Sequence, residues 1–231
     1  MTTERAIGMA LALLVVASVM PIASAGAQET KDGKVKLEVK LPRPMFTGTP
    51  KNIRTPNLEP ARKGKKRADF FVPKGTTNVA VDKAVTGSDT EPVIGELELI
   101  TDGDKEGVEG SYVELGPGQQ YVQIDLEAKY KIHAIVMWHY HSQARVYRDV
   151  IIQTANDPDF IMDVQTVYNN DHDNSAGLGV GKAYEYIETY EGRLAPVKGV
   201  VGRYVRLYSS GSTSNELNHY TEVEVFAQPT E

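Results

Sequence analysis

The chain of 231 residues contains no cysteine and only one tryptophan. Without cysteine the protein forms no disulfide and carries no thiol-linked lipid, so packing and any bound metal must supply its stability. The composition is otherwise ordinary, with 41% hydrophobic and 24% charged residues, 20 glycines and 12 prolines. These values exclude collagen, low-complexity disorder and small disulfide-rich scaffolds.

Several functional motifs are also missing from the sequence. It has no glycine loop that would cradle a phosphate, no dinucleotide fingerprint, no zinc-protease motif and no internal repeat of useful length. A serine-rich loop, Ser209–Asn215, has no matched histidine and acid in a defined order, so it does not indicate a nucleophile. We therefore assign no catalytic residue.

Charge is distributed unevenly along the chain. Residues 31–74 contain 13 Lys and Arg against 4 Asp and Glu, whereas residues 75–231 contain 11 against 25. An acidic body repels a phosphate backbone, so we expect no nucleic-acid partner unless the basic segment supplies the contacts.

The N-terminus has the pattern of a cleavable secretory signal. Arg5 precedes an apolar run, Ile7–Met20, which Pro21 ends, and small residues follow up to Ala27. The run is shorter than the ~20 residues that cross a bilayer, which disfavours the alternative of a retained anchor. We predict a signal peptide at residues 1–27, a secreted or periplasmic mature protein, and no transmembrane segment after cleavage.

The composition of residues 28–74 predicts an extended, basic, proline-containing arm, or linker. Six prolines interrupt it, and Arg62–Arg67 holds five cations. The arm is either a solvated spacer or a patch that contacts an acidic polymer or a partner surface. Its short apolar pieces, such as Phe70–Val72, could also dock on the following domain.

From Thr76 onward, short apolar or alternating runs are separated by Gly, Asp and Asn turns, as in antiparallel sandwiches. None of the runs has helical periodicity. We predict strands at residues 96–101, 121–126, 132–139, 149–154, 164–168, 183–189, 203–208 and 221–227.

Five short sequence segments, in the same order along the chain as in a known family, show a resemblance to that family. They are Asn78–Thr86, Ile100–Asp104, Tyr121–Leu126, Arg203–Leu207 and Thr221–Phe226. Over roughly residues 76–228 the chain resembles the discoidin, or coagulation factor 5/8 type C, domains and their galactose-binding-like carbohydrate-binding relatives. The resemblance implies an all-β jelly-roll β-sandwich of about eight antiparallel strands, at residues 75–229, whose loops at one end bind ligand. The chain departs from the family in having Tyr112 and Tyr121 where tryptophan is common, and in lacking the terminal cysteine pair of the animal members.

A carboxylate-rich turn, Asp102–Gly107, suits calcium because glycines let carbonyls turn inward beside hard oxygen ligands. It is not an EF-hand, since the twelfth position is Val113. In the resembled family a structural Ca²⁺ sits in this loop and is closed by an acid on the last strand, which implies the metal ligands Asp102, Asp104 and Glu222. The alternative is an acidic surface turn.

The segment from Trp138 to Arg148 ends an apolar strand and is rich in aromatic and basic residues. If the strand continues, His139 and His141 share one side, and with His172 they would form a metal centre of a hydrolase or cupin-like enzyme. The favoured interpretation is a rim that stacks on a sugar and bonds its hydroxyls. The predicted ligand-binding residues of this rim are Tyr140, His141, Arg145, Arg148, His219 and Tyr220.

A long polar loop, Asn169–Gly181, is an alternative location for ligand contacts. The sequence thus predicts a non-catalytic binding module that recognises a carbohydrate or a glycosylated or cell-surface partner. The rivals are the histidine-based metal enzyme and a structural or adhesive envelope protein that uses the basic arm.

Overall fold

The computed structural model describes residues 33–46, 50 and 52–230. The predicted signal peptide at residues 1–27 lies outside the described residues. The described chain is a β-protein with a single short 3₁₀ helix, η1 (Leu97–Ile100), which confirms the predicted all-β class. Nowhere in the described ranges does a helix have the length and apolarity that crossing a membrane would require.

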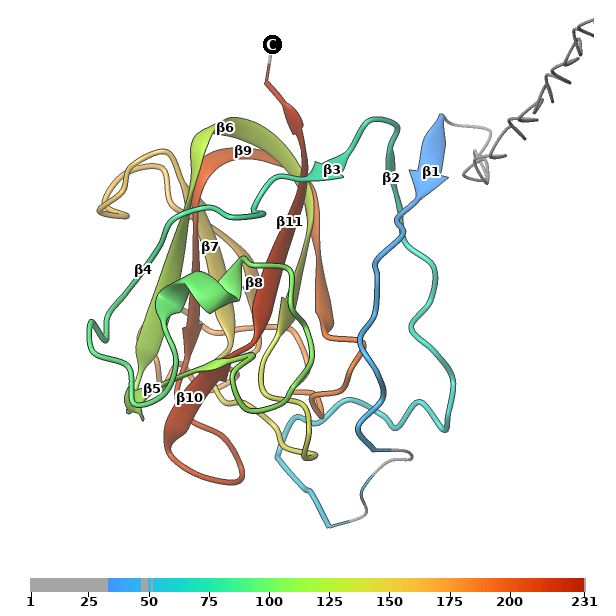
Figure 1. Cartoon of the computed structure of the whole chain (residues 1–231), viewed down its shortest axis with the longest axis vertical. Coiled ribbons are helices and arrows are strands. Elements are labelled where there is room, and N and C mark those ends of the chain that lie inside the picture. The colour runs from blue at the N-terminus through green and yellow to red at the C-terminus, as the bar shows by residue number, and fades with distance from the viewer. Residues whose placement is uncertain (1–32, 47–49, 51, 231) are drawn as a thin grey trace, which may run out of the picture.

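Two long strands build both layers of the sandwich. Strand β6 (Gln120–Trp138) pairs antiparallel with β9 (Arg193–Ser209) along almost their whole lengths. Figure 1 shows the two strands arching side by side over one end of the molecule, so each contributes one half to each layer. The loops around residues 140–148 and 210–216 lie at the opposite end.

The bend has a local cause in the backbone. The register between β6 and β9 shifts between Asp125 and Tyr130, and Glu127 takes a left-handed φ of 67°. An extra stretch of residues in one strand of a pair bends that strand and increases its twist. The sheet therefore folds over itself instead of remaining flat.

The remaining strands extend these two layers. The first layer runs β4 (Val85–Gly87), β6, β9, β7 (Ile151–Ala155) and β8 (Gln165–Asn169). The second layer runs β3 (Thr77–Asn78), β11 (Glu222–Pro229), β6 and β9. A separate pair, β5 (Val113–Pro117) with β10 (Leu217–Tyr220), lies at the loop end.

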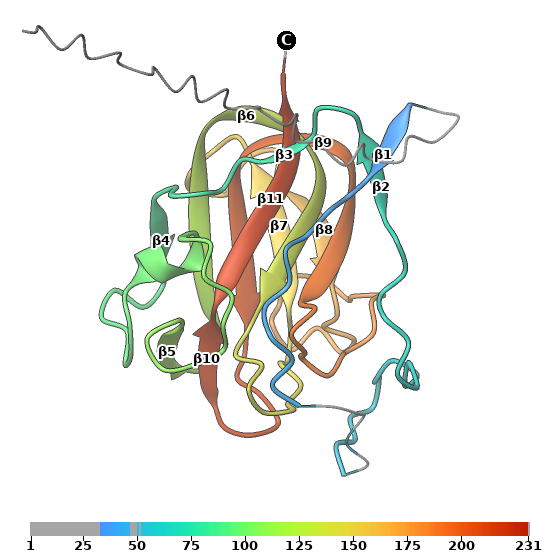
Figure 2. The same ribbon diagram turned by 45° about the vertical axis from the view of Figure 1, so that its right-hand side comes forward.

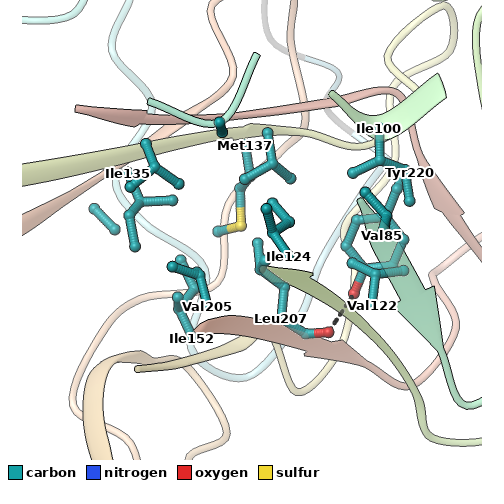
Figure 3. Packing of buried hydrophobic residues seen from close by; sticks show 14 of the residues in the cluster. Val85, Ile100, Val122, Ile124, Ile135, Met137, Ile152, Val205, Leu207 and Tyr220 are labelled. Carbon is teal, nitrogen blue, oxygen red and sulfur yellow. Dashed lines mark hydrogen bonds between the residues drawn. The ribbon is translucent and has the colours of Figure 1, made fainter. Parts of the chain in front are cut away.

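The core lies between the two layers. Ile135 and Met137 of the second layer face Ile124, Val205 and Leu207 of the first (Figure 3), and all are fully buried. Alternation along each strand places these side chains inward, and their burial is the main favourable term in folding.

The arm packs on the outer surface of the second layer. Its strands β1 (Lys34–Lys36) and β2 (Phe71–Pro73) pair with each other. Its apolar side chains Leu37, Val39 and Phe70 contact a second buried cluster, made of Ala134, Val136, Trp138 and Phe226. Figure 2 shows the arm running along this face. Both faces of β6 are consequently covered, which is why residues 132–139 are an unbroken buried run.

Two predicted strands are absent at their expected places. Residues 97–100 form η1, and residues 183–189 are irregular apart from a bridge between Glu185 and Leu58 of the arm. Aromatic and apolar residues predicted a strand at 183–189, but the backbone at Glu185 pairs with the arm and not with a sheet edge. The short strands β4, β5 and β10 were not among the predicted runs.

Candidate functional site

Three aromatic rings meet at the loop end of the sandwich. Tyr112 precedes β5, Tyr140 follows β6, and His219 lies in β10. The rings of Tyr112 and Tyr140 are 5.0 Å apart in an edge-to-face arrangement, and each ring centroid is 5.9 Å from that of His219. Both tyrosines are half-buried, so each keeps part of its ring in contact with solvent. We call these three residues, with Arg145 and Glu114, the aromatic site.

Arg145 lies beneath Tyr140. Its guanidinium carbon is 4.7 Å from the Tyr140 ring centroid, a distance at which cation and ring attract each other. The side chain is buried, and its Nε and Nη1 atoms have no hydrogen-bond partner among the described residues. Arg145 therefore fixes the Tyr140 ring and places a positive charge behind the site, close enough to act on the Glu114 carboxylate.

A histidine and a carboxylate form the floor of the site. His219 and Glu114 are opposite each other in the β10–β5 pair, and Nε2 of His219 is 2.8 Å from a Glu114 carboxylate oxygen. Burial lowers the pKa of His219 to about 4, and the positive charge of Arg145 adds to this effect. Burial also raises the pKa of Glu114 above its ordinary value, against the opposing influence of Arg145. At neutral pH a neutral His219 thus donates from Nε2 to the Glu114 carboxylate.

The other three residues of the predicted rim lie elsewhere. His141 is buried and turns away, with Nε2 2.7 Å from the Lys105 carbonyl oxygen. Arg148 is exposed and pairs with Glu216 at 3.4 Å. Tyr220 is fully buried in the core beside Ile100 (Figure 3), and its hydroxyl bonds the Leu207 carbonyl. The structure therefore brings together only Tyr140, Arg145 and His219 from that rim.

The histidines of the alternative metal centre do not converge. Strand β6 ends at Trp138, so His139 and His141 do not share a strand face. Nδ1 of His139 is 3.0 Å from a Glu188 oxygen inside the protein, whereas His172 is exposed. None of the three belongs to a group of ligating atoms close enough to hold one ion, as judged over the residues that the structure describes. The geometry gives no support to the histidine-based enzyme.

The predicted calcium loop is held to the last strand. The Gly103 amide donates to Oε2 of Glu222 at 3.1 Å, and the Asp104 amide donates to Asp102 at 2.8 Å. Asp104 itself accepts from the Glu106 amide and from the Ser111 hydroxyl. The loop and Glu222 thus lie together, although the three carboxylates do not converge on one point in the described chain.

The burial and hydrogen bonding of Glu222 show whether these residues fit a cation. It is fully buried, and its Oε1 has no partner among the described residues. Burial raises the pKa of Glu222 to about 9, and the neighbouring Glu224 contributes in the same direction while the Gly103 amide opposes it. An orphaned buried carboxylate oxygen beside a glycine-containing loop fits a hard cation such as Ca²⁺.

A second carboxylate cluster joins the long polar loop to the segment before β7. Ligand atoms of Asp149, Asp171 and Asp173 lie within 4.8 Å of one another. The Ser175 amide donates to Asp171, and the Ala176 amide does so too. These bonds organise the loop, because Asp and Asn side chains readily accept from nearby backbone amides.

Comparisons with known proteins find related folds but no sequence family. No family model matches the chain, and no curated protein matches it. Among solved structures, the family 89 glycoside hydrolase of Clostridium perfringens matches 66% of this chain with a TM-score of 0.51 and 16% identity. The match spans 15% of the length of that hydrolase.

Two smaller structures match over almost their whole length. The CBM32 of AlyQ, solved with 4,5-unsaturated mannuronic acid, covers 63% of this chain and 96% of its own, at 22% identity and a TM-score of 0.46. A fucose-binding module of Streptococcus pneumoniae covers 66% of this chain and 98% of its own, at 18% identity and a TM-score of 0.47.

The chain has the galactose-binding-like jelly-roll fold. In this galactose-binding-like sandwich, the aromatic site contains two residues that sequence reasoning did not assign, Tyr112 and Glu114. Tyr112 occupies a position where the resembled family often has tryptophan, which is the signal that could have identified it. Glu114 gave no such signal, because only the pairing of β5 with β10 places it opposite His219.

Proposed function

We propose that this chain is a secreted, non-catalytic binding module that holds a carbohydrate at the aromatic site and uses a structural calcium ion. The observation that carries the proposal is the pair of half-exposed tyrosine rings, Tyr112 and Tyr140, set edge to face at the loop end. Aromatic faces pack on the apolar C–H faces of sugars, and such sites combine apolar contact with a few placed polar groups.

Polar groups around the rings suit a neutral sugar. No described residue hydrogen-bonds the phenol hydroxyl of Tyr112 or of Tyr140, so both are available to sugar hydroxyls. Glu114 accepts from His219 with one oxygen and offers a second acceptor at the edge of the site. Arg145 contributes its charge from below while keeping the Tyr140 ring in place.

Two further points favour binding over catalysis. The fold is that of a sandwich shared with small carbohydrate-binding modules, and the part of the hydrolase that the chain matches is a small share of that enzyme. Fold analogy identifies a class of function and not a ligand. The aromatic site, moreover, pairs its one histidine with a carboxylate on a rigid strand pair and presents no activated nucleophile.

Calcium and export complete the proposal. Glu222, Asp102 and loop carbonyls would hold the ion, which would neutralise the buried carboxylate and tie the loop to β11. The signal pattern supports export, and a mature chain that begins near Gln28 is what N-terminal sequencing should find.

A glycan array with the mature protein, run with and without calcium, identifies the sugar. Replacing Tyr112 or Tyr140 by Ala should then weaken binding of that sugar at least tenfold, equivalent to about 1.4 kcal/mol. The melting temperature should stay within a few degrees because both rings are half-exposed.

Tyr184→Ala is the matched control, since Tyr184 is exposed and lies outside the aromatic site. It should bind as the parent does. If the parent binds no glycan, or if the Tyr112 and Tyr140 variants bind normally while Tyr184→Ala does not, the proposed site is wrong.

A further inference from the structure

The arm and the sandwich together enclose a row of cavities that the aromatic site does not use. Three cavities of about 280, 700 and 270 Å³ lie between arm residues 44–70 and residues 186–194 of the sandwich. Arg62 and Thr189 line all three, so the cavities adjoin one another. We call this row the arm cleft. Figures 1 and 2 show this part of the arm at the same end of the molecule as the binding loops.

Some of the cations of the arm have a structural partner. Arg62 forms an ion pair with the buried Glu191, and the amide of Arg67 donates to the same carboxylate at 3.1 Å. Arg193 of the sandwich pairs with Glu59 of the arm at 2.9 Å. These bonds fix the walls of the arm cleft, and the charges that they involve are already compensated.

Four other cations of the arm cleft have no ion-pair partner among the residues that the structure describes. Lys63, Lys65, Lys66 and Arg54 line its cavities and make no ion pair within the described part of the chain. The three lysines are exposed. Lys63 adopts a left-handed φ of 52°, followed by Gly64 at 78°, and the Lys65 amide closes this turn on the Arg62 carbonyl at 3.0 Å. A lysine is uncommon in that conformation. The turn places the side chains of Lys63, Lys65 and Lys66 along the walls of the cavities.

The walls between these cations are mainly apolar. Leu58, Pro60 and Ile187 line the largest cavity, and Phe46 and Tyr190 line the first. The backbone of the arm here is already paired, since the Glu59 amide donates to the Glu185 carbonyl and the Glu185 amide to the Asn57 carbonyl. A bound peptide backbone would therefore find few partners, whereas sugar rings need apolar faces and hydroxyl contacts only.

We propose that the arm cleft is a second binding site, for an acidic polysaccharide. The carboxylate or sulfate groups of the polymer pair with Lys63, Lys65 and Lys66, and its ring faces pack on the apolar walls. A single-stranded nucleic acid is the other polyanion that these cations could attract, and it therefore serves as a competitor in the test. The site is separate from the aromatic site, so either can exist without the other.

The test uses the mature full-length protein and three soluble hexasaccharides: a uronate, a sulfated sugar and a neutral glucan. The parent should bind the uronate or the sulfated probe, and not the glucan, with an affinity that falls steeply as salt is added. The triple variant Lys63→Gln, Lys65→Gln, Lys66→Gln should bind that probe at least tenfold more weakly, with an unchanged melting temperature.

The control removes the same charge from the opposite end of the sandwich. Lys129, Lys131 and Lys198 are exposed and lie near the bend of β6 and β9, so their replacement by Gln should leave affinity within about twofold. Tyr140→Ala should also leave it unchanged, which separates this site from the aromatic site. The proposal is overturned if the arm-cleft triple binds like the parent, if the control triple is equally weak, or if polyglutamate or single-stranded DNA competes as well as the acidic sugar.

Discussion

At the scale of single residues, Glu222 couples the stability of the sandwich to pH and to metal. Its pKa of about 9 lies above the ordinary value of 4.5, so without metal the folded protein retains a proton that the unfolded chain releases. This contribution to stability is complete below pH 4.5 and is lost as the pH rises through 9. His219 acts in the opposite direction, because its pKa of about 4 makes the folded state less stable as the pH falls below 6.5.

We expect the metal-free protein to lose stability between pH 6.5 and 9, by up to roughly 1.4 kcal/mol per pH unit for one proton. Calcium should reduce this loss because the ion takes the place of the proton on Glu222. In Glu222→Gln both the pH dependence in this range and the response to calcium should disappear, as measured by urea unfolding with chelator or calcium.

Asp171→Asn is the control for this experiment, because it alters the second carboxylate cluster and leaves Glu222 intact. It should keep the calcium response of the parent. A calcium response that survives in Glu222→Gln but vanishes in Asp171→Asn would place the ion in the other cluster.

At the scale of elements, the arm is part of the folded unit. It covers Val136, Trp138 and Phe226, which would otherwise form an apolar patch on the outer surface of the second layer. Trp138 is fully buried in this contact, and its indole nitrogen donates to the Tyr190 carbonyl at 2.9 Å. Gly192 is required beside it, because a Cβ there would lie 2.7 Å from the indole ring.

Trp138 is the only tryptophan, so its fluorescence reports directly on the arm. Phe70→Ala should shift its emission to longer wavelength and lower the free energy of unfolding by about 1 kcal/mol, because Phe70 is half-buried on this cluster. Phe71→Ala changes a neighbouring exposed ring and should do neither. Equal effects of the two substitutions would show that the arm does not pack on Trp138.

At the scale of the whole molecule, opposite charges of the arm and the sandwich hold the two together. The links include Arg43 with Glu106, Arg62 with Glu191 and Arg193 with Glu59, and they connect the arm to two parts of the sandwich, the loop at Glu106 and the segment from Glu191 to Arg193. A network of such pairs, together with the covered apolar patch, should make arm and sandwich unfold in one step.

Urea unfolding followed by Trp138 fluorescence and by far-ultraviolet circular dichroism should therefore give coincident transitions. The first signal reports the interface of the arm, and the second reports the sheets. A fluorescence change at lower urea than the dichroism change would mean that the arm detaches first.

Much of the architecture could be predicted from local patterns. Alternation in Tyr121–Leu126 and the apolar run before Trp138 identified strands, because side chains on a strand alternate and the core takes one face. The short strands β4, β5 and β10 were missed because three to five residues carry little periodicity. Residues 183–189 were predicted as a strand because a pattern of apolar residues indicates burial. Such a pattern does not show which segment packs on the run, and here that segment is the arm.

The sequence by itself determined the all-β class, the basic arm and the jelly-roll resemblance, which depend on local composition or on the order of short segments. That resemblance, and not a local pattern, implied that Glu222 lies near the carboxylate loop. Only the tertiary structure decided the site. Because β6 ends at Trp138, His141 points into the protein, and Tyr220 is buried in the core. The pairing of β5 with β10 places Glu114 beside His219 and Tyr112 beside Tyr140. Tertiary structure also placed the arm against the second layer. Contacts between segments about a hundred residues apart depend on how the whole sheet folds over, and no local pattern encodes that.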